Sequence, residues 1–156
     1  MPLEKTITDL MVEEHFLLER LLAKLEEALR EGYETSVDLL GEFKREFNRH
    51  ISVEENAVFK FFNPEEESDY YEVVPKLVKE HNTILEMLND TENRLATGGI
   101  KEISEGYSNF KKLLMSHREF EEKRFYPEMD KNLSATQKKE IREKIHSGFP
   151  GLSNQY

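Results

Sequence analysis

The sequence predicts an all-α fold, an up-down-up-down four-helix bundle with a short C-terminal helix. The 156 residues are 35% charged and 37% hydrophobic, a mixture typical of amphipathic helices rather than of a β-rich fold. Apolar residues recur at helical spacing in four long segments with short breaks between them. Short connections make consecutive helices antiparallel neighbours, which predicts the bundle. We expect one domain over 1–156, with the bundle over about 3–130 and the C-terminal helix and tail over 131–156.

The first two helices have clear stop signals. The first helix is expected from Pro2 to Glu31, because apolar residues at steps of three and four end at Gly32. The second is expected over Thr35–Phe62. Asn63-Pro64 ends it, since the residue before a proline disfavours the helical region.

The third and fourth helices each contain a proline. The third is expected over Ser68–Ala96, with its regular part beginning near Pro75, and Gly98-Gly99 ends it. The fourth is expected over Ile100–Asp130, and Pro127 weakens its last turn.

A short fifth helix is expected at about 135–146. Ser134 and Gln137 have the spacing of a capping box in front of it. The tail that follows is expected to be irregular. His146 has no partner by spacing and should be exposed.

One pattern occurs twice: a single His and then, one helix later, His-x-x-x-Glu. The two His of a copy are 35 residues apart in the first copy and 36 in the second, and the copies are offset by 66–67 positions. In an antiparallel bundle these residues fall at one depth, roughly 18 Å from one end at about 1.5 Å per residue. The candidate metal ligands are His15, His50, Glu54, His81, His117 and Glu121.

These residue types suit a paired metal site. Imidazole suits Fe, Zn, Cu and Ni, and carboxylates are harder ligands that can bridge two ions. Each His-x-x-x-Glu presents a terminal ligand and a potential bridge from one helix face. Six side chains cannot saturate two octahedral ions, so water, oxo, hydroxo or O₂ would fill the rest. We expect two non-haem Fe ions per chain with a bridging oxo or hydroxo group. A metal-free polar network and a zinc-binding bundle are the alternatives.

The neighbours of these ligands receive simpler interpretations. Glu14 and Glu80 are one step off the ligand face, and we expect them on the solvated surface, with contact to the ligands as the alternative. Glu55 and Glu122 follow the bridging glutamates and are also expected on the surface, with a role as spare ligands as the alternative. Apolar side chains should pack around the metals, and these are Met11, Leu18, Phe47, Ile84, Leu85 and Leu114.

Bulk properties exclude several classes of function. A net charge of −10 argues against nucleic acid as a partner and against attraction to an anionic membrane. The chain has no Cys, which excludes disulfides, thiolate metal sites and a Cys nucleophile. No signal peptide is evident in MPLEKTITDL, and no apolar run reaches the roughly 18 residues of a transmembrane helix. We therefore expect a cytoplasmic protein.

The order His, His-x-x-x-Glu, His, His-x-x-x-Glu resembles the hemerythrin-like (HHE cation-binding) domain family over about 5–130. The stretch LMVEEHFLLERLLAKLEEAL looks like the first helix of that family. The resemblance implies a four-helix bundle with a non-haem di-iron centre. It also assigns the ligand roles: terminal ligands His15, His50, His81 and His117, and bridging carboxylates Glu54 and Glu121.

Two positions differ from the oxygen-carrying hemerythrins. Those proteins have His-x-x-x-His on helix three, where this chain has Leu85, and His-x-x-x-x-Asp on helix four, where it has His-x-x-x-Glu. The set is closer to the di-iron proteins of iron–sulfur cluster repair, whose Cys-containing domain is absent here, and to iron- or oxygen-sensing domains. The expected function is binding or sensing of O₂, NO or iron. The alternative is an enzyme that reduces peroxide or NO, oxidises ferrous iron, or acts in stress repair of iron–sulfur clusters.

Overall fold

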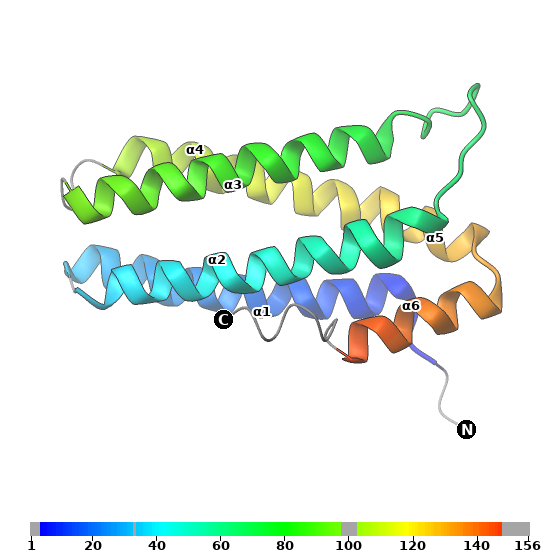
Figure 1. Ribbon diagram of the computed structural model, residues 1–156, viewed down its shortest axis with the longest axis horizontal. Coiled ribbons are helices and arrows are strands. Elements are labelled where there is room, and N and C mark those ends of the chain that lie inside the picture. The colour runs from blue at the N-terminus through cyan, green and yellow to red at the C-terminus, as the bar shows by residue number, and fades with distance from the viewer. Residues whose placement is uncertain (1–3, 33, 98–102, 148–156) are drawn as a thin grey trace.

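The computed structural model describes residues 4–32, 34–97 and 103–147, and every regular element within these ranges is helical. Four long helices lie lengthwise beside one another (Figure 1). They are α1 (Ile7–Glu31), α2 (Thr35–Val53), α3 (Val73–Thr97) and α4 (Ser104–Phe120). α1 packs on α2, α3 packs on α4, and α2 packs on α3. The all-α prediction is confirmed for these ranges, and none of their helices is apolar enough over a sufficient length to cross a membrane.

α2 and α4 both continue into a π-helical turn at the glutamate of their motif. α2 runs into η1 (Glu54–Val58) and a 3₁₀ turn, η2 (Phe59–Phe61). α4 runs into η4 (Glu121–Phe125) and then α5 (Tyr126–Asn132). Single π turns inside helices occur frequently at functional sites. Their matched positions extend the internal repeat of the sequence to the backbone.

The first helix has well-defined ends. Thr6 caps α1 by accepting from the Asp9 N–H at 3.0 Å, and the Asp9 side chain accepts from the Thr6 N–H at 3.3 Å. Asp130 of α5 adds a second cap, with hydrogen bonds of 2.8 Å and 2.9 Å from the N–H groups of Ile7 and Thr8. Gly32 ends the helix with φ 71°, a left-handed conformation that favours glycine.

The C-terminal helix α6 (Ala135–Ser147) confirms the predicted fifth helix. Ser134 and Gln137 exchange hydrogen bonds of 3.0 Å and 3.1 Å, as the capping box requires. α6 packs on α1 and η1, so it covers the end of the molecule that also holds α5 (Figure 1). His146 is exposed, as expected.

Several predicted boundaries differ from the structure. α1 begins at Ile7 rather than Pro2, because Thr6 is its N-cap. α3 begins at Val73 rather than Ser68, because residues 68–72 form turns, and Pro75 stands in its first turn, where an N–H has no helical partner. Pro127 likewise stands in the first turn of α5, and the helix continues beyond it to Asn132. The predicted stop at Gly98-Gly99 and the irregular tail lie outside the described residues.

The core has two apolar parts with a polar layer between them. One part joins the start of α1 to η2, α5 and α6, and includes Met11, Phe59, Leu77, Phe125 and Ile141. The other fills the space between the far halves of the long helices, and includes Leu22, Phe43, Phe47, Leu88 and Phe110. The predicted metal ligands lie between these two parts.

Candidate metal centre

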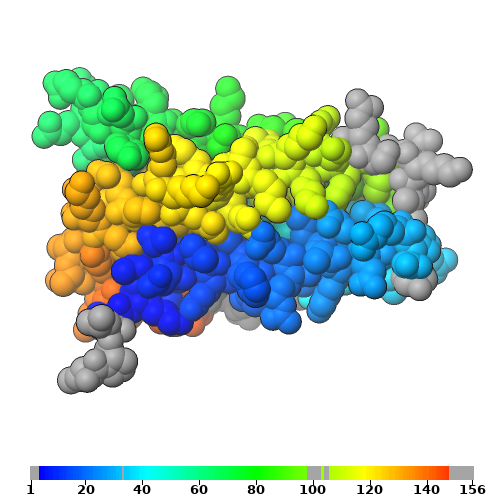
Figure 2. Space-filling view, turned by 180° about the vertical axis from the view of Figure 1, so that it is seen from behind, coloured from blue at the N-terminus to red at the C-terminus, as the bar shows by residue number. Residues whose placement is uncertain are grey.

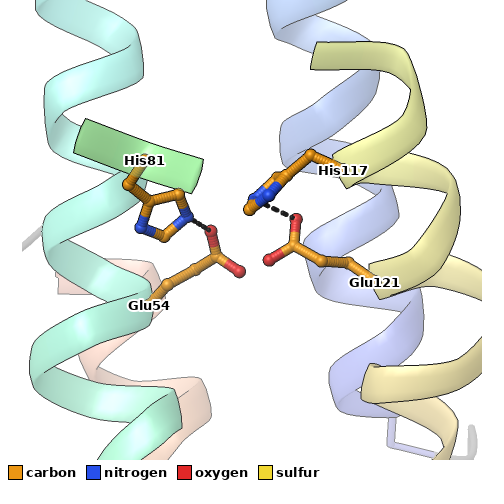
Figure 3. Close-up of side chains that lie close together, drawn as sticks. All are labelled: Glu54, His81, His117 and Glu121. Atoms are coloured by element: carbon orange, nitrogen blue, oxygen red, sulfur yellow. Dashed lines mark ion pairs between the residues drawn. The ribbon is translucent and has the colours of Figure 1, made fainter. Parts of the chain in front are cut away.

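The structure brings all six predicted ligands together. Each is at most 4% exposed, which is unusual for histidine and glutamate side chains. Ring centroids are 4.8 Å apart for His15 and His50, and 4.7 Å apart for His81 and His117. Figure 3 shows four of the six, Glu54, His81, His117 and Glu121, pointing toward one another from η1, α3, α4 and η4. The prediction that the repeat places these residues at one depth is confirmed.

Each carboxylate lies between histidines from both halves of the repeat. Glu54 Oε1 is 3.1 Å from His50 Nε2 and 3.2 Å from His81 Nε2. Glu121 Oε1 is 3.4 Å from His15 Nε2 and 3.3 Å from His117 Nε2. Both glutamates therefore connect a histidine of the first hairpin with one of the second, the placement that a bridging carboxylate requires.

The cluster contains two overlapping groups of donor atoms, and within each group all donor atoms lie within 4.8 Å of one another. One group is Glu54, His81, His117 and Glu121, and the other is His15, His50 and Glu121. Glu121 belongs to both groups. Each of the two groups could hold a metal ion.

The outer nitrogen of every ligand histidine is bound by another glutamate. Each helix supplies one such glutamate to the histidine of the next helix, and the last supplies the first, so the four contacts close a ring. The Nδ1–Oε distances are 3.0 Å for Glu14 to His50, 3.2 Å for Glu55 to His81, 2.9 Å for Glu80 to His117 and 3.0 Å for Glu122 to His15.

This ring fixes the orientation of the imidazoles. A carboxylate can only accept, so each Nδ1 donates its proton outward, and in the neutral imidazole each Nε2 then presents its lone pair inward. Metal-bound histidines are held by the same kind of contact in proteins generally. All four rings thus carry the tautomer that a metal ion needs.

The expectation that these four glutamates are ordinary surface residues is wrong. Glu14 is 7% exposed and also accepts from Arg49 Nη2 at 3.0 Å. Glu55, Glu80 and Glu122 keep 31%, 22% and 26% of their side chains exposed, yet each reaches a buried imidazole. A residue one step off the inner face points into the seam between two helices, where the next helix presents its histidine.

Unpaired atoms inside the cluster fit a metal ion. Among the described residues, Glu54 Oε1, His81 Nε2, His117 Nε2 and both Glu121 oxygens are buried without a hydrogen-bond partner. Their N–O contacts have ion-pair distances but lack hydrogen-bond geometry. Buried polar atoms without partners are costly, and a cation would satisfy them together. The donor set fits Fe as well as it fits Zn.

The distance between the imidazoles of His15 and His50 also fits a shared metal ion. His15 Nε2 and His50 Nε2 are 3.2 Å apart inside the cluster. Two nitrogens about 2.1 Å from one ion, at roughly right angles to each other, are about 3 Å apart.

Charges in the cluster shift its proton affinities strongly. Burial opposes protonation of His50, but the charge of Glu54 and the hydrogen bond to Glu14 outweigh it and raise the pKa well above 6.5. Burial also opposes protonation of His117, and Glu121 with Glu80 outweighs it, raising the pKa to about 10. Burial raises the pKa of Glu54, but the charge of His50 and the hydrogen bonds of its neighbours together outweigh it and lower the pKa well below 4.5. Protons therefore occupy the cluster when no metal does.

Tyr126 is a site residue that the sequence interpretation missed. Its side chain is fully buried, and its hydroxyl donates to Glu54 Oε2 at 2.7 Å and lies 3.3 Å from His15 Nε2. Burial and the nearby carboxylates Glu121 and Glu54 raise its pKa well above 10. The signal was its position five residues after Glu121. A π turn places such a residue on the same face, whereas an α-helix turns it away.

A small cavity reaches the cluster from the side. It has a volume of about 20 Å³, which is room for a molecule the size of water or a diatomic gas. His15, His50, His117 and Glu121 line its inner end, with hydrocarbon from Leu18, Leu22, Phe47 and Leu114. Figure 2 shows the face on which α1 and α4 lie next to each other, the two helices that supply most of the lining. Glu19 of α1 and Arg118 of α4 form an ion pair in this lining and are partly exposed.

Fold and site together define an all-helical protein with a buried His/Glu cluster that could bind metal. The family model "Hemerythrin HHE cation binding domain" matches residues 6–129. The chain belongs to this family, which confirms the resemblance seen in the sequence. Comparisons with curated proteins and with solved structures found no match.

Proposed function

We propose that the chain is a non-haem di-iron protein that binds or senses O₂, NO or iron. Its fold would be an up-down-up-down four-helix bundle, and its six ligands would be His15, His50, Glu54, His81, His117 and Glu121. The observation that carries this proposal is the ring of four glutamates, because it turns four Nε2 lone pairs toward one buried point.

The residues of the chain would have distinct roles around the metals. His15 and His50 would hold one ion and His81 and His117 the other, and Glu121 is placed between the two groups. Iron, when bound, supplies exchangeable electrons and open coordination positions. The two apolar parts of the core exclude bulk water, which strengthens the electrostatic contacts inside the cluster.

The apolar cavity favours a protein that binds a gas over an enzyme that converts peroxide or NO. Reduction of peroxide or NO consumes protons, and the lining beside the histidines is mostly hydrocarbon, with its charged side chains Glu19 and Arg118 held in an ion pair. A cavity of about 20 Å³ has room for a small ligand such as O₂ or NO. O₂ and NO are therefore the ligands that we propose first.

Exposure of the reduced protein to gas tests this proposal. The protein is loaded with Fe²⁺ under argon, exposed to O₂ or NO, and then purged, while visible absorption is followed. A binding protein develops a new spectrum that reverts on purging, at one gas molecule per iron pair. Sustained consumption of peroxide, NO or O₂ in the presence of a reductant would support the enzyme alternative instead.

A further inference from the structure

The internal repeat pairs Tyr126 with Phe59. The two residues are 67 positions apart, the same offset as Glu54 and Glu121. Each follows its glutamate by five residues and donates its backbone N–H to the carbonyl of that glutamate across the π turn. Tyr126 and Phe59 are therefore equivalent residues in the two halves of the site.

The two rings take similar places beside a ligand histidine. The Phe59 ring is 5.8 Å from His81 at an interplanar angle of 8°, and the Tyr126 ring is 5.7 Å from His15 at 42°. Both side chains are buried, at 5% and 0% exposed. The main chemical difference within the pair is the hydroxyl of Tyr126, which only one half of the site carries.

This hydroxyl gives the two oxygens of Glu54 different partners. Oε1 lies between His50 and His81, whereas Oε2 accepts the 2.7 Å hydrogen bond from Tyr126 on the His15 side. Neither oxygen of Glu121 has such a donor among the described residues. The two carboxylates, equivalent by sequence, thus differ in what they can offer a cation.

The donor groups reflect this difference. Four donors converge around His81 and His117, and Glu54 is one of them. Only three converge around His15 and His50, where Glu54 is missing. Glu54 reaches His50 through Oε1, at 3.1 Å, but its other oxygen is held by the Tyr126 hydroxyl, which lies beside His15.

We propose that Tyr126 is a positioning residue that makes the two metal positions unequal. Its hydroxyl retains Glu54 Oε2, so only Oε1 of Glu54 remains for the metals, whereas Glu121 keeps both oxygens, and the position of His15 and His50 has the smaller group of donors. The inference rests on the proposed di-metal function. The position with fewer protein ligands keeps more room for an external ligand, and it borders the cavity.

Titration of the metal-free protein with Co²⁺ tests this inference. Visible absorption reports the geometry of each bound ion, and calorimetry reports the two affinities. Wild-type protein should bind two equivalents, the second more weakly. In Tyr126→Phe a buried carboxylate oxygen loses its donor and becomes available to the ion. A hydrogen bond to a charged group corresponds to roughly a tenfold or larger effect, so the second equivalent should bind about tenfold more tightly, with a changed spectrum.

Tyr107→Phe is the matched control. The Tyr107 hydroxyl also donates to a glutamate, Glu26 Oε1 at 2.9 Å, but that pair lies away from the cluster. Removing it should leave both Co²⁺ affinities and both spectra as in the wild type.

The outcomes separate the two proposals. Two equivalents in wild type with an unchanged or weaker second step in Tyr126→Phe would overturn the role of Tyr126 alone. Fewer than two equivalents in wild type would overturn the proposed function as well. Mössbauer spectra of wild-type protein loaded with ⁵⁷Fe²⁺ need no variant: two distinct iron signals are expected, and one signal for both ions would contradict the inference.

Discussion

Substitution of Glu14 or Glu80 directly perturbs the contacts by which glutamates orient the histidines. They occupy equivalent positions in the two halves, and each binds the Nδ1 of the next helix's histidine, at 3.0 Å for His50 and 2.9 Å for His117. Replacement by Gln keeps the shape and one acceptor oxygen but removes the charge. The change therefore weakens the hold on the imidazole without removing any proposed ligand.

The expected size follows from the contacts. Loss of a partner that orients a metal-bound histidine typically lowers metal affinity about 10–100-fold, which is roughly 1.4–2.7 kcal/mol. Glu14 is 7% exposed, so its charge acts with little solvent screening and Glu14→Gln should fall near the upper end. The Glu80 side chain is 22% exposed, so Glu80→Gln should fall near the lower end.

Competition for metal against a chelator of known affinity measures both changes. Glu86→Gln is the control, because Glu86 is an exposed residue of the same helix as Glu80. Its affinity should stay within about twofold of wild type. If Glu14→Gln and Glu80→Gln behaved like Glu86→Gln, the argument that the ring orients the histidines would be refuted.

Three further outcomes are expected. Glu54→Ala and Glu121→Ala should each lose metal and lower the melting temperature of metal-loaded protein, and unchanged iron content in both would contradict the bridging roles. Asp130→Ala should lower the free energy of unfolding by about 1–2 kcal/mol in denaturant titrations, because it caps α1 through two backbone N–H groups. The pKa of His117 is raised from 6.5 to about 10, so its protonation stabilises metal-free protein fully below pH 6.5 and progressively less toward pH 10. Thermal melts of metal-free protein should therefore show falling stability from pH 7 to 10, and a flat profile would contradict the assignment.

Helical periodicity was sufficient to predict the cluster from the sequence. A His and a Glu four residues apart stack on one face of an α-helix, and the nearly equal offsets of the two copies placed all six side chains at one depth. The start of α3 was harder to predict from the sequence, because residues 68–72 have a partly apolar pattern but form turns. The single domain over 1–156 stays a prediction.

The π turns explain what the sequence interpretation missed. A uniform α-helical period rotates each residue by about 100°, so a residue five positions after Glu121 would point away from the cluster. The backbone bond from Tyr126 N–H to the Glu121 carbonyl spans five residues and returns that position to the inner face. An extra residue within a helical turn leaves no strong local signal in composition. Only the offset shared by Phe59 and Tyr126 indicated their common role.

Metal content per chain tests the central claim most directly. Untagged protein from iron-supplemented cells is analysed by elemental mass spectrometry against its concentration. Two irons per chain are expected, since two groups of donors share Glu121. No iron, or a single zinc, would contradict the di-iron proposal and leave a helical member of the family with a different use for its buried His/Glu cluster.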